Sequence, residues 1–132
     1  MAKIVYRNVR HPATPDRMEW LQRHFGVTSQ DIVTQDVPYG SDPVAAVMAV
    51  INNLSGDVVA VEAGGPEPVM IALAEGLAMK GIVLIRQVYQ RDPVTGRVVV
   101  TGQDESGRDI FAFDRYEAVE IEVRKALVGK PL

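Results

Sequence analysis

The segment 57–89 constrains the fold more than any other part of the sequence. An apolar run over 58–61 leads to a glycine-proline turn at 64–66. An apolar, helix-like segment follows over 68–80, and one glycine separates it from a second apolar run at 82–85. Strand, turn, helix, glycine and strand in this order predict a right-handed βαβ crossover, and therefore a parallel pair of strands. Parallel sheets bind ligands at the carboxyl ends of their strands, which is where the glycine-proline turn falls.

Two similar units precede this crossover. The patterns predict a strand over 4–9, a helix from Pro15 to Gly26, a strand over 31–37 and a helix over 44–54. Thr14 and proline at the first helical position are typical of a helix start, and glycine is typical of a helix end. We therefore expect an α/β fold with a mainly parallel sheet in the order 2-1-3-4. Right-handed crossovers would place the first helix on one face and the next two on the other.

The pattern changes after residue 89. Turn residues occur at 91–96 and 104–107, and short strand candidates lie between and after them, over 97–101 and 109–113, which predict a β-hairpin appended to the sheet. Asp114 is expected to cap a final helix, whose apolar face would carry Tyr116, Val119, Val123 and Leu127. The chain is thus expected to be a single domain over 1–132, with a core over 1–90 and a hairpin plus helix over 91–132.

Composition excludes several classes of function. With 14 Lys and Arg against 17 Asp and Glu, the net charge of −3 does not suit a protein that coats duplex DNA. The chain has no cysteine, which favours a cytoplasmic location, and its apolar stretches are too short to cross a membrane. No spacing of His, Asp and Glu is typical of a metal site, and the glycine spacing of a dinucleotide site is absent. We expect neither a metal nor a cofactor.

Two of the expected helices have almost no charge. No charged residue occurs over 44–53, and Glu75 is the only one over 69–77. A helix that is apolar all round is usually buried on more than one side. This predicts self-association through the helices 44–54 and 67–80, most simply as a two-fold homodimer. The alternative is that alanine fills the outward positions of both helices.

Candidate ligand-binding residues follow the strands. Asn8, Arg10 and His11 come after the first strand and offer donors suited to a phosphate or a base edge. The third strand is followed by Gly64, Gly65, Pro66 and Glu67, where free backbone N–H groups could attract an anion. In the order 2-1-3-4 these two turns are neighbours at the topological switch point. The alternative for both is a solvated turn without a ligand.

Further candidates end the second and fourth strands. Tyr39 and Ser41 follow the second strand, and Arg86 and Tyr89 lie at the end of the fourth. Arginine could neutralise a phosphate and tyrosine could stack on a base. Alternate residues of a strand face opposite ways, so these residues cannot all serve one site.

The segment His11-Pro12-Ala13-Thr14, and the turn 64–66 with the helix up to Leu77, resemble a group of small CRISPR-associated proteins. These are stand-alone, Rossmann-like (CARF-like) relatives of the domains that bind cyclic oligoadenylate in type III systems. The resemblance covers about the first ninety residues. It implies a Rossmann-like, three-layer fold and a homodimer that binds the cyclic RNA in a two-fold cleft. The loops 8–11 and 64–67 of both subunits would line that cleft.

The function implied by the resemblance is to bind cyclic oligoadenylate in antiviral defence and to sequester it. A second possibility is cleavage without metal by the ligand's own 2′-hydroxyl, for which His11 and Arg10 are the candidate assisting residues. Two alternatives do not depend on the resemblance. One is a protein–protein interaction module, and the other is an enzyme on a different nucleotide or phosphorylated metabolite that uses Glu62 and Glu67.

Overall fold

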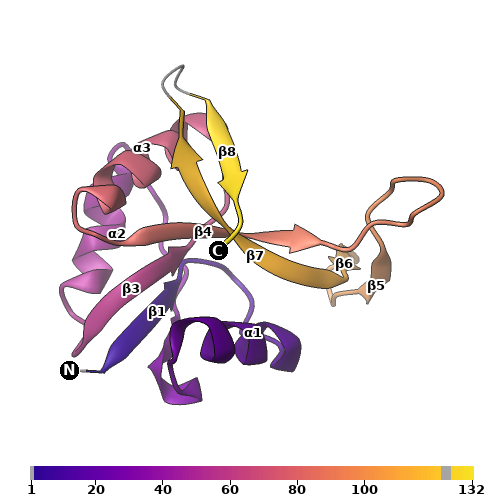
Figure 1. The fold of residues 1–132 in the computed structure, drawn as a ribbon, viewed down its shortest axis with the longest axis horizontal. Coiled ribbons are helices and arrows are strands. Elements are labelled where there is room, and N and C mark those ends of the chain that lie inside the picture. Colours follow the sequence, from indigo (N-terminus) through magenta and orange to yellow (C-terminus); the bar gives the residue numbers. More distant parts are fainter. Residues whose placement is uncertain (1, 123–125) are drawn as a thin grey trace.

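The computed structural model describes residues 2–122 and 126–132 and shows a twisted sheet with three helices and a projecting arm (Figure 1). The first part contains β1 (Lys3–Arg7), α1 (Pro15–Phe25), a short 3₁₀ turn η1 (Ser29–Asp31), β2 (Ile32–Thr34), α2 (Pro43–Ile51), β3 (Asp57–Glu62), α3 (Glu67–Ala78) and β4 (Val83–Tyr89). The second part contains β5 (Val100–Gln103), β6 (Asp109–Phe111), β7 (Phe113–Ile121) and β8 (Leu127–Lys130).

The main sheet has six strands in the order β2-β1-β3-β4-β7-β8. Its first four strands are parallel, with Val5 of β1 opposite Ile32 of β2 and Ala60 of β3. β7 pairs antiparallel with β4, and β8 pairs antiparallel with β7, so the sheet is mixed but mainly parallel. The order expected for the four N-terminal strands is confirmed, and the sheet continues beyond it by two strands.

The helices lie on both faces of this sheet and form two separate cores. Because side chains alternate along a strand, β1 directs Val5 to one face and Tyr6 to the other. Val5 packs with Leu21 of α1, whereas Tyr6 packs with residues of α2 and α3. α2 and α3 approach each other closely, since a Cβ atom on Gly76 would lie 2.6 Å from a methyl group of Val44.

The prediction of a C-terminal helix is wrong. The chain from Phe113 to Ile121 is the strand β7, and β8 pairs with it. Without β7, the backbone of β4 would have an unpaired edge, and pairing satisfies it. Arg86 and Glu117 face each other across this pair, with Nε 2.6 Å from Oε1. Val123 of the predicted helix lies outside the described residues.

The hairpin is also placed differently from the expectation. β5 and β6 are not appended to the main sheet but form a two-stranded sheet of their own. They belong to a segment over 90–112, called the arm here, that projects from the body (Figure 1). At its base the Gln90 N–H donates to the Ala112 carbonyl at 2.8 Å, and the Ala112 N–H donates to the Val99 carbonyl at 2.9 Å.

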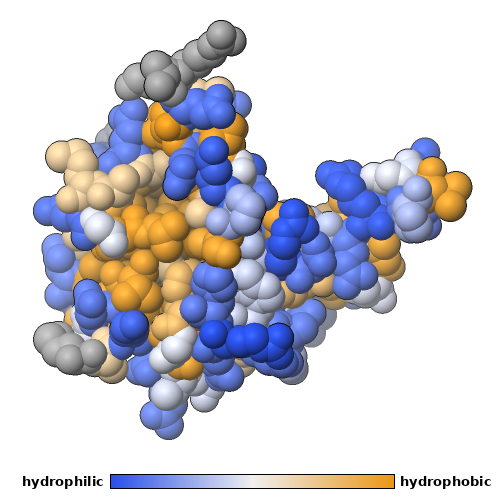
Figure 2. Space-filling view, viewed as in Figure 1, coloured by the Kyte–Doolittle hydropathy of each residue, from blue (hydrophilic) through white to orange (hydrophobic). Residues whose placement is uncertain are grey.

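The surface of the body is partly apolar. Figure 2 shows hydrophobic residues over β3 and β4 in the view of Figure 1. On α2 the exposed side chains include Ala45 and Ala49, so small apolar residues occupy outward positions of this helix. Within the described part of the chain, no helix has the length and the apolar character that crossing a membrane requires.

Candidate functional site

A buried polar network lies at the carboxyl ends of β1 and β3. Arg7 ends β1 and Glu62 ends β3, and each is only 1% exposed. The Arg7 Nε donates to Glu62 Oε1 at 2.7 Å. The same carboxylate accepts the hydroxyl of Tyr116 from β7 and the amide of Gln87 from β4, both at 2.6 Å. Glu62 of β3 thus binds side chains from three other strands on the α1 side of the sheet.

The electrostatics of this network keep Arg7 charged. Burial opposes the charge on Arg7, but the charge and hydrogen bonds of Glu62 and Tyr116 together outweigh it and raise the pKa of the guanidinium above its usual value. Burial and the same carboxylate both raise the pKa of the Tyr116 hydroxyl, which therefore remains a donor at neutral pH. A buried charge needs such partners because leaving one unpaired in a protein interior costs several kcal/mol, on the order of 3–5.

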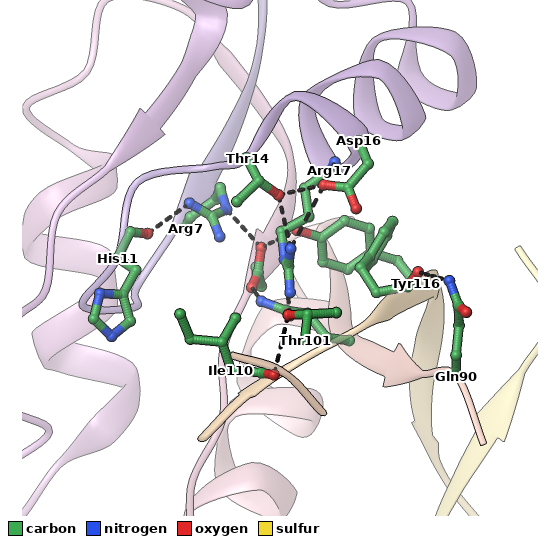
Figure 3. Close-up of polar contacts among 12 residues, drawn as sticks. Arg7, His11, Thr14, Asp16, Arg17, Gln90, Thr101, Ile110 and Tyr116 are labelled. Atoms are coloured by element: carbon green, nitrogen blue, oxygen red, sulfur yellow. Dashed lines mark hydrogen bonds and ion pairs between the residues drawn. The ribbon is translucent and has the colours of Figure 1, made fainter. Parts of the chain in front are cut away.

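Arg7 also fixes the loop that follows β1. Its Nη1 donates to the carbonyl of His11 at 3.0 Å and to the hydroxyl of Thr34 in β2 at 2.9 Å. Figure 3 shows the contact with the His11 carbonyl. The backbone of the loop 8–14 is therefore anchored to a side chain inside the sheet.

A second arginine, Arg17 of α1, extends the network toward the surface. Its Nε donates to the Gln87 carbonyl oxygen at 3.0 Å, and its Nη1 donates to the Thr14 hydroxyl at 2.7 Å (Figure 3). Its guanidinium carbon lies 4.9 Å from the ring centre of Phe113, a cation–π distance. Arg17 is thus held in place on three sides.

A cavity of about 440 Å³ opens above these residues, and we call it the arm cavity. One wall is the body of the protein and the other is the arm with the end of β4. The residues that line it are Arg7, Val9, Arg10, His11, Pro12, Thr14, Arg17, Gln87, Tyr89, Asp104, Asp109, Ile110 and Phe111. Volumes of 300–1,000 Å³ are typical of sites for small molecules.

The arm wall combines aromatic rings with carboxylates. The ring centres of Tyr89 and Phe111 lie 5.2 Å apart. Asp104 accepts hydrogen bonds from the Ser106 hydroxyl at 2.8 Å and the Arg108 N–H at 2.9 Å, and these bonds lower the pKa of its carboxyl group. Asp104 is therefore an anionic acceptor held in place at the rim.

The body wall contributes two exposed basic side chains. His11 lies with its Nε2 3.9 Å from Asp104 Oδ2, so the two walls approach each other here. Arg10 is exposed and makes no hydrogen bond or ion pair with any residue of 2–122 or 126–132. Its charge is available to a ligand, whereas those of Arg7 and Arg17 are already engaged.

Three of the residues predicted from the sequence, Arg10, His11 and Tyr89, line the arm cavity together. They do so because the carboxyl ends of β1 and β4 lie at one edge of the sheet, as parallel strands require. Their role in binding stays a prediction.

Other predicted residues form a separate group at the same edge. Asn8 is buried, and its side-chain oxygen accepts the backbone N–H of Val37 at 2.7 Å. The Tyr39 hydroxyl donates to the Gly64 carbonyl at 2.9 Å, and its ring lies against Gly65. Gly65 has φ = 151°, which residues with a Cβ rarely adopt. These contacts shape the turns.

The remaining predicted residues lie outside the arm cavity. Pro66 and Glu67 start α3 and are exposed, as is Ser41 before α2. Arg86 alternates with Gln87 along β4, so it faces the α2 and α3 side, where it pairs with Glu117. The structure does not bring Arg86 to the residues that line the arm cavity.

Sequence reasoning named Glu62 only for the alternative enzyme, and it did not predict the polar network or the arm wall. Arg7 carries a signal that could have identified it, since, like Glu62, it is a charged residue at the end of a strand whose inner residues are apolar. The arm residues carry no such signal, because Asp104 to Phe111 reach the cavity only through the folding back of the hairpin.

The arrangement can bind a ligand that has an anionic group, a flat ring and hydrogen-bond donors. Arginine suits the anion, the rings of Tyr89 and Phe111 suit the flat group, and Asp104 and Asp109 suit the donors. Comparison of the chain with models of known protein families, with curated proteins and with solved structures found no match.

Proposed function

We propose that the protein binds a nucleotide ligand in the arm cavity, and that the ligand is built of adenylate units, as in cyclic oligoadenylate. The observation that carries the proposal is the pairing of the two walls. Arg10, which has no partner among the described residues, lies on one wall, and the rings of Tyr89 and Phe111 lie on the other. Phosphate groups favour arginine, and bases stack on aromatic rings.

The place of the cavity supports the same proposal. It lies at the carboxyl ends of β1 and β4, next to the point where the strand order reverses between β1 and β3. Open α/β sheets bind nucleotides at such a point, which favours a Rossmann-like relationship for the four parallel strands. Asp104 and Asp109 would accept hydrogen bonds from an amino group or a ribose hydroxyl.

The role we propose is sequestration by a homodimer. A cavity of 440 Å³ fits about one nucleotide unit, so a ring of several units would extend over more than one protomer. Sedimentation of the protein with and without ligand measures this assembly.

The test is calorimetric titration of the full chain with cyclic tetra-adenylate and cyclic hexa-adenylate, followed by chromatography of the mixture. Arg10→Ala is expected to weaken binding about tenfold to a hundredfold, because a hydrogen bond to a charged group contributes about 1.5–3 kcal/mol. Arg23→Ala is the matched control, since Arg23 is exposed on α1 and pairs with Glu19. Intact ligand after incubation supports sequestration, and shortened products make the protein a nuclease. Absence of binding at about 100 μM ligand, which corresponds to roughly −5.5 kcal/mol, refutes the proposal.

A second candidate function is a protein–protein interaction module. Val100, Ile110 and Phe111 of the arm are exposed apolar side chains, which is unusual when they share a short hairpin. A module of this kind would keep its partner when Arg10 is changed to Ala and would show no affinity for nucleotides.

A further inference from the structure

We propose that the site takes at least two nucleotide units joined by a phosphate, one on each side of the loop 10–13, with Arg10 at the linking phosphate. This inference rests on the proposed function and specifies its ligand. It follows from a second cavity, of about 410 Å³, which lies on the other side of the same loop. The lining residues of the second cavity are Arg10, Pro12, Ala13, Met18, Ile32 and Thr34.

The two cavities are neighbours that share a wall. Arg10 and Pro12 line both of them, so the loop 10–13 is a ridge with a cavity on each flank. A ligand that filled both would cross this ridge, and the part that crosses it would meet Arg10. Since Arg10 has no partner among the described residues, its guanidinium is free to bind a charged linker there.

The ridge is held firmly by buried groups. Arg7 donates to the His11 carbonyl on the ridge and to the Thr34 hydroxyl in the wall of the second cavity. Arg7 is itself fixed by Glu62. Both cavities are thus preformed around one buried ion pair, which reduces the ordering that a ligand must impose on the protein.

The linings indicate different tasks for the two cavities. Both cavities have more apolar than polar lining, but the arm cavity also has carboxylates and the Gln87 amide beside its aromatic rings. The second cavity is mostly apolar, because Ala13, Met18 and Ile32 form much of its lining, with the Thr34 hydroxyl as a polar group. An apolar cavity with few polar groups suits the face of a base. The ligand therefore places a whole nucleotide in the arm cavity and a second base in the other.

The test compares two adenine ligands of equal charge by calorimetry on the full chain. One is the linear dinucleotide ApA, and the other is adenosine 5′-methylphosphate, which has the same single negative charge and only one base. The wild-type protein is expected to bind ApA at least about tenfold more tightly, because the second base binds intramolecularly. Ala13→Phe, which fills the second cavity, is expected to abolish this difference. Ala45→Phe on the exposed side of α2 is the matched control.

The outcomes separate this inference from the proposed function. If both ligands bind with equal affinity to the wild-type protein, the two-unit ligand is refuted and nucleotide binding stands. Equal preference for ApA in the wild-type protein and in folded Ala13→Phe also refutes it. If neither ligand binds and cyclic oligoadenylates do not bind either, both the inference and the proposed function fail.

Discussion

Replacing Glu62 by Gln tests whether the buried ion pair organises the site. The change is nearly isosteric, but it removes the negative charge that faces Arg7 at 2.7 Å. It also introduces an amide NH₂ in a place where both carboxylate oxygens of Glu62 now accept hydrogen bonds. If the new NH₂ faces Gln87, two donors meet. Gln87 cannot turn its amide to relieve this, because its oxygen accepts from Arg17 at 3.0 Å.

The expected loss of stability is large. Breaking a buried ion pair by removing one partner costs about 3–5 kcal/mol, because the other charge stays buried without compensation. The free energy of unfolding of such domains is about 5–15 kcal/mol in total, so Glu62→Gln should lose at least about a fifth of the stability. Removing the charge of Arg7 as well should recover part of the lost stability. The double variant Arg7→Met/Glu62→Gln is therefore expected to lose less than the sum of the two single variants.

The assay is denaturant unfolding followed by the fluorescence of Trp20, the one tryptophan of the chain. Its ring lies 5.4 Å from that of Tyr116, so the signal reports on the region of the network. Glu19→Gln is the control, because Glu19 and Arg23 form an exposed pair whose loss should change the free energy of unfolding by less than about 1 kcal/mol. A loss below about 1 kcal/mol for Glu62→Gln as well would refute the view that Arg7 depends on this carboxylate.

Two further predictions concern pH and packing. Burial raises the pKa of Tyr6 to about 12 while its hydroxyl donates to the Gln35 carbonyl at 2.8 Å. The unfolded chain ionises this group first, so its stabilising effect is complete below pH 10 and is lost as the pH rises toward 12. The stability advantage of the wild-type protein over Tyr6→Phe, measured by urea unfolding, should therefore shrink across this range, and a constant advantage would contradict the assignment. Gly76→Ala should lower the free energy of unfolding by about 1–3 kcal/mol, because the new methyl group collides with Val44, whereas Gly102→Ala meets no atom within 4 Å and should be nearly neutral.

The N-terminal part of the fold could be predicted because local pattern and final structure agree there. Pro15 and Gly26 bound the first helix in the sequence and in the structure. Asp42 caps α2 through a hydrogen bond from the Ala45 N–H. The prediction of a C-terminal helix was based on the helical spacing of residues such as Tyr116 and Val119. It is wrong because the same segment forms the strand that pairs with β4. Pairing over a whole strand outweighs a local periodicity.

The candidate site could be predicted only in part for a related reason. Arg10 and His11 were found because they follow a strand whose end faces a ligand site in any parallel sheet. Asp104 and Phe111 could not be found, because their distance from His11 depends on how the arm folds back. Asn8 was identified as a ligand residue, yet it holds the backbone at Val37, since a polar side chain near a strand end can serve either purpose.

The arm is inserted between β4 and β7, two strands that pair with each other, and this affects how such a protein could diversify. Its two ends, Gln90 and Ala112, are bonded to each other, and β4 and β7 pair directly beyond these ends. Because closing a longer or shorter loop changes the entropy of folding only slowly with length, this segment can be exchanged at small cost to the sheet. One wall of the cavity is therefore an interchangeable module, and a descendant of this chain could acquire a new ligand by replacing some twenty residues without rebuilding its core.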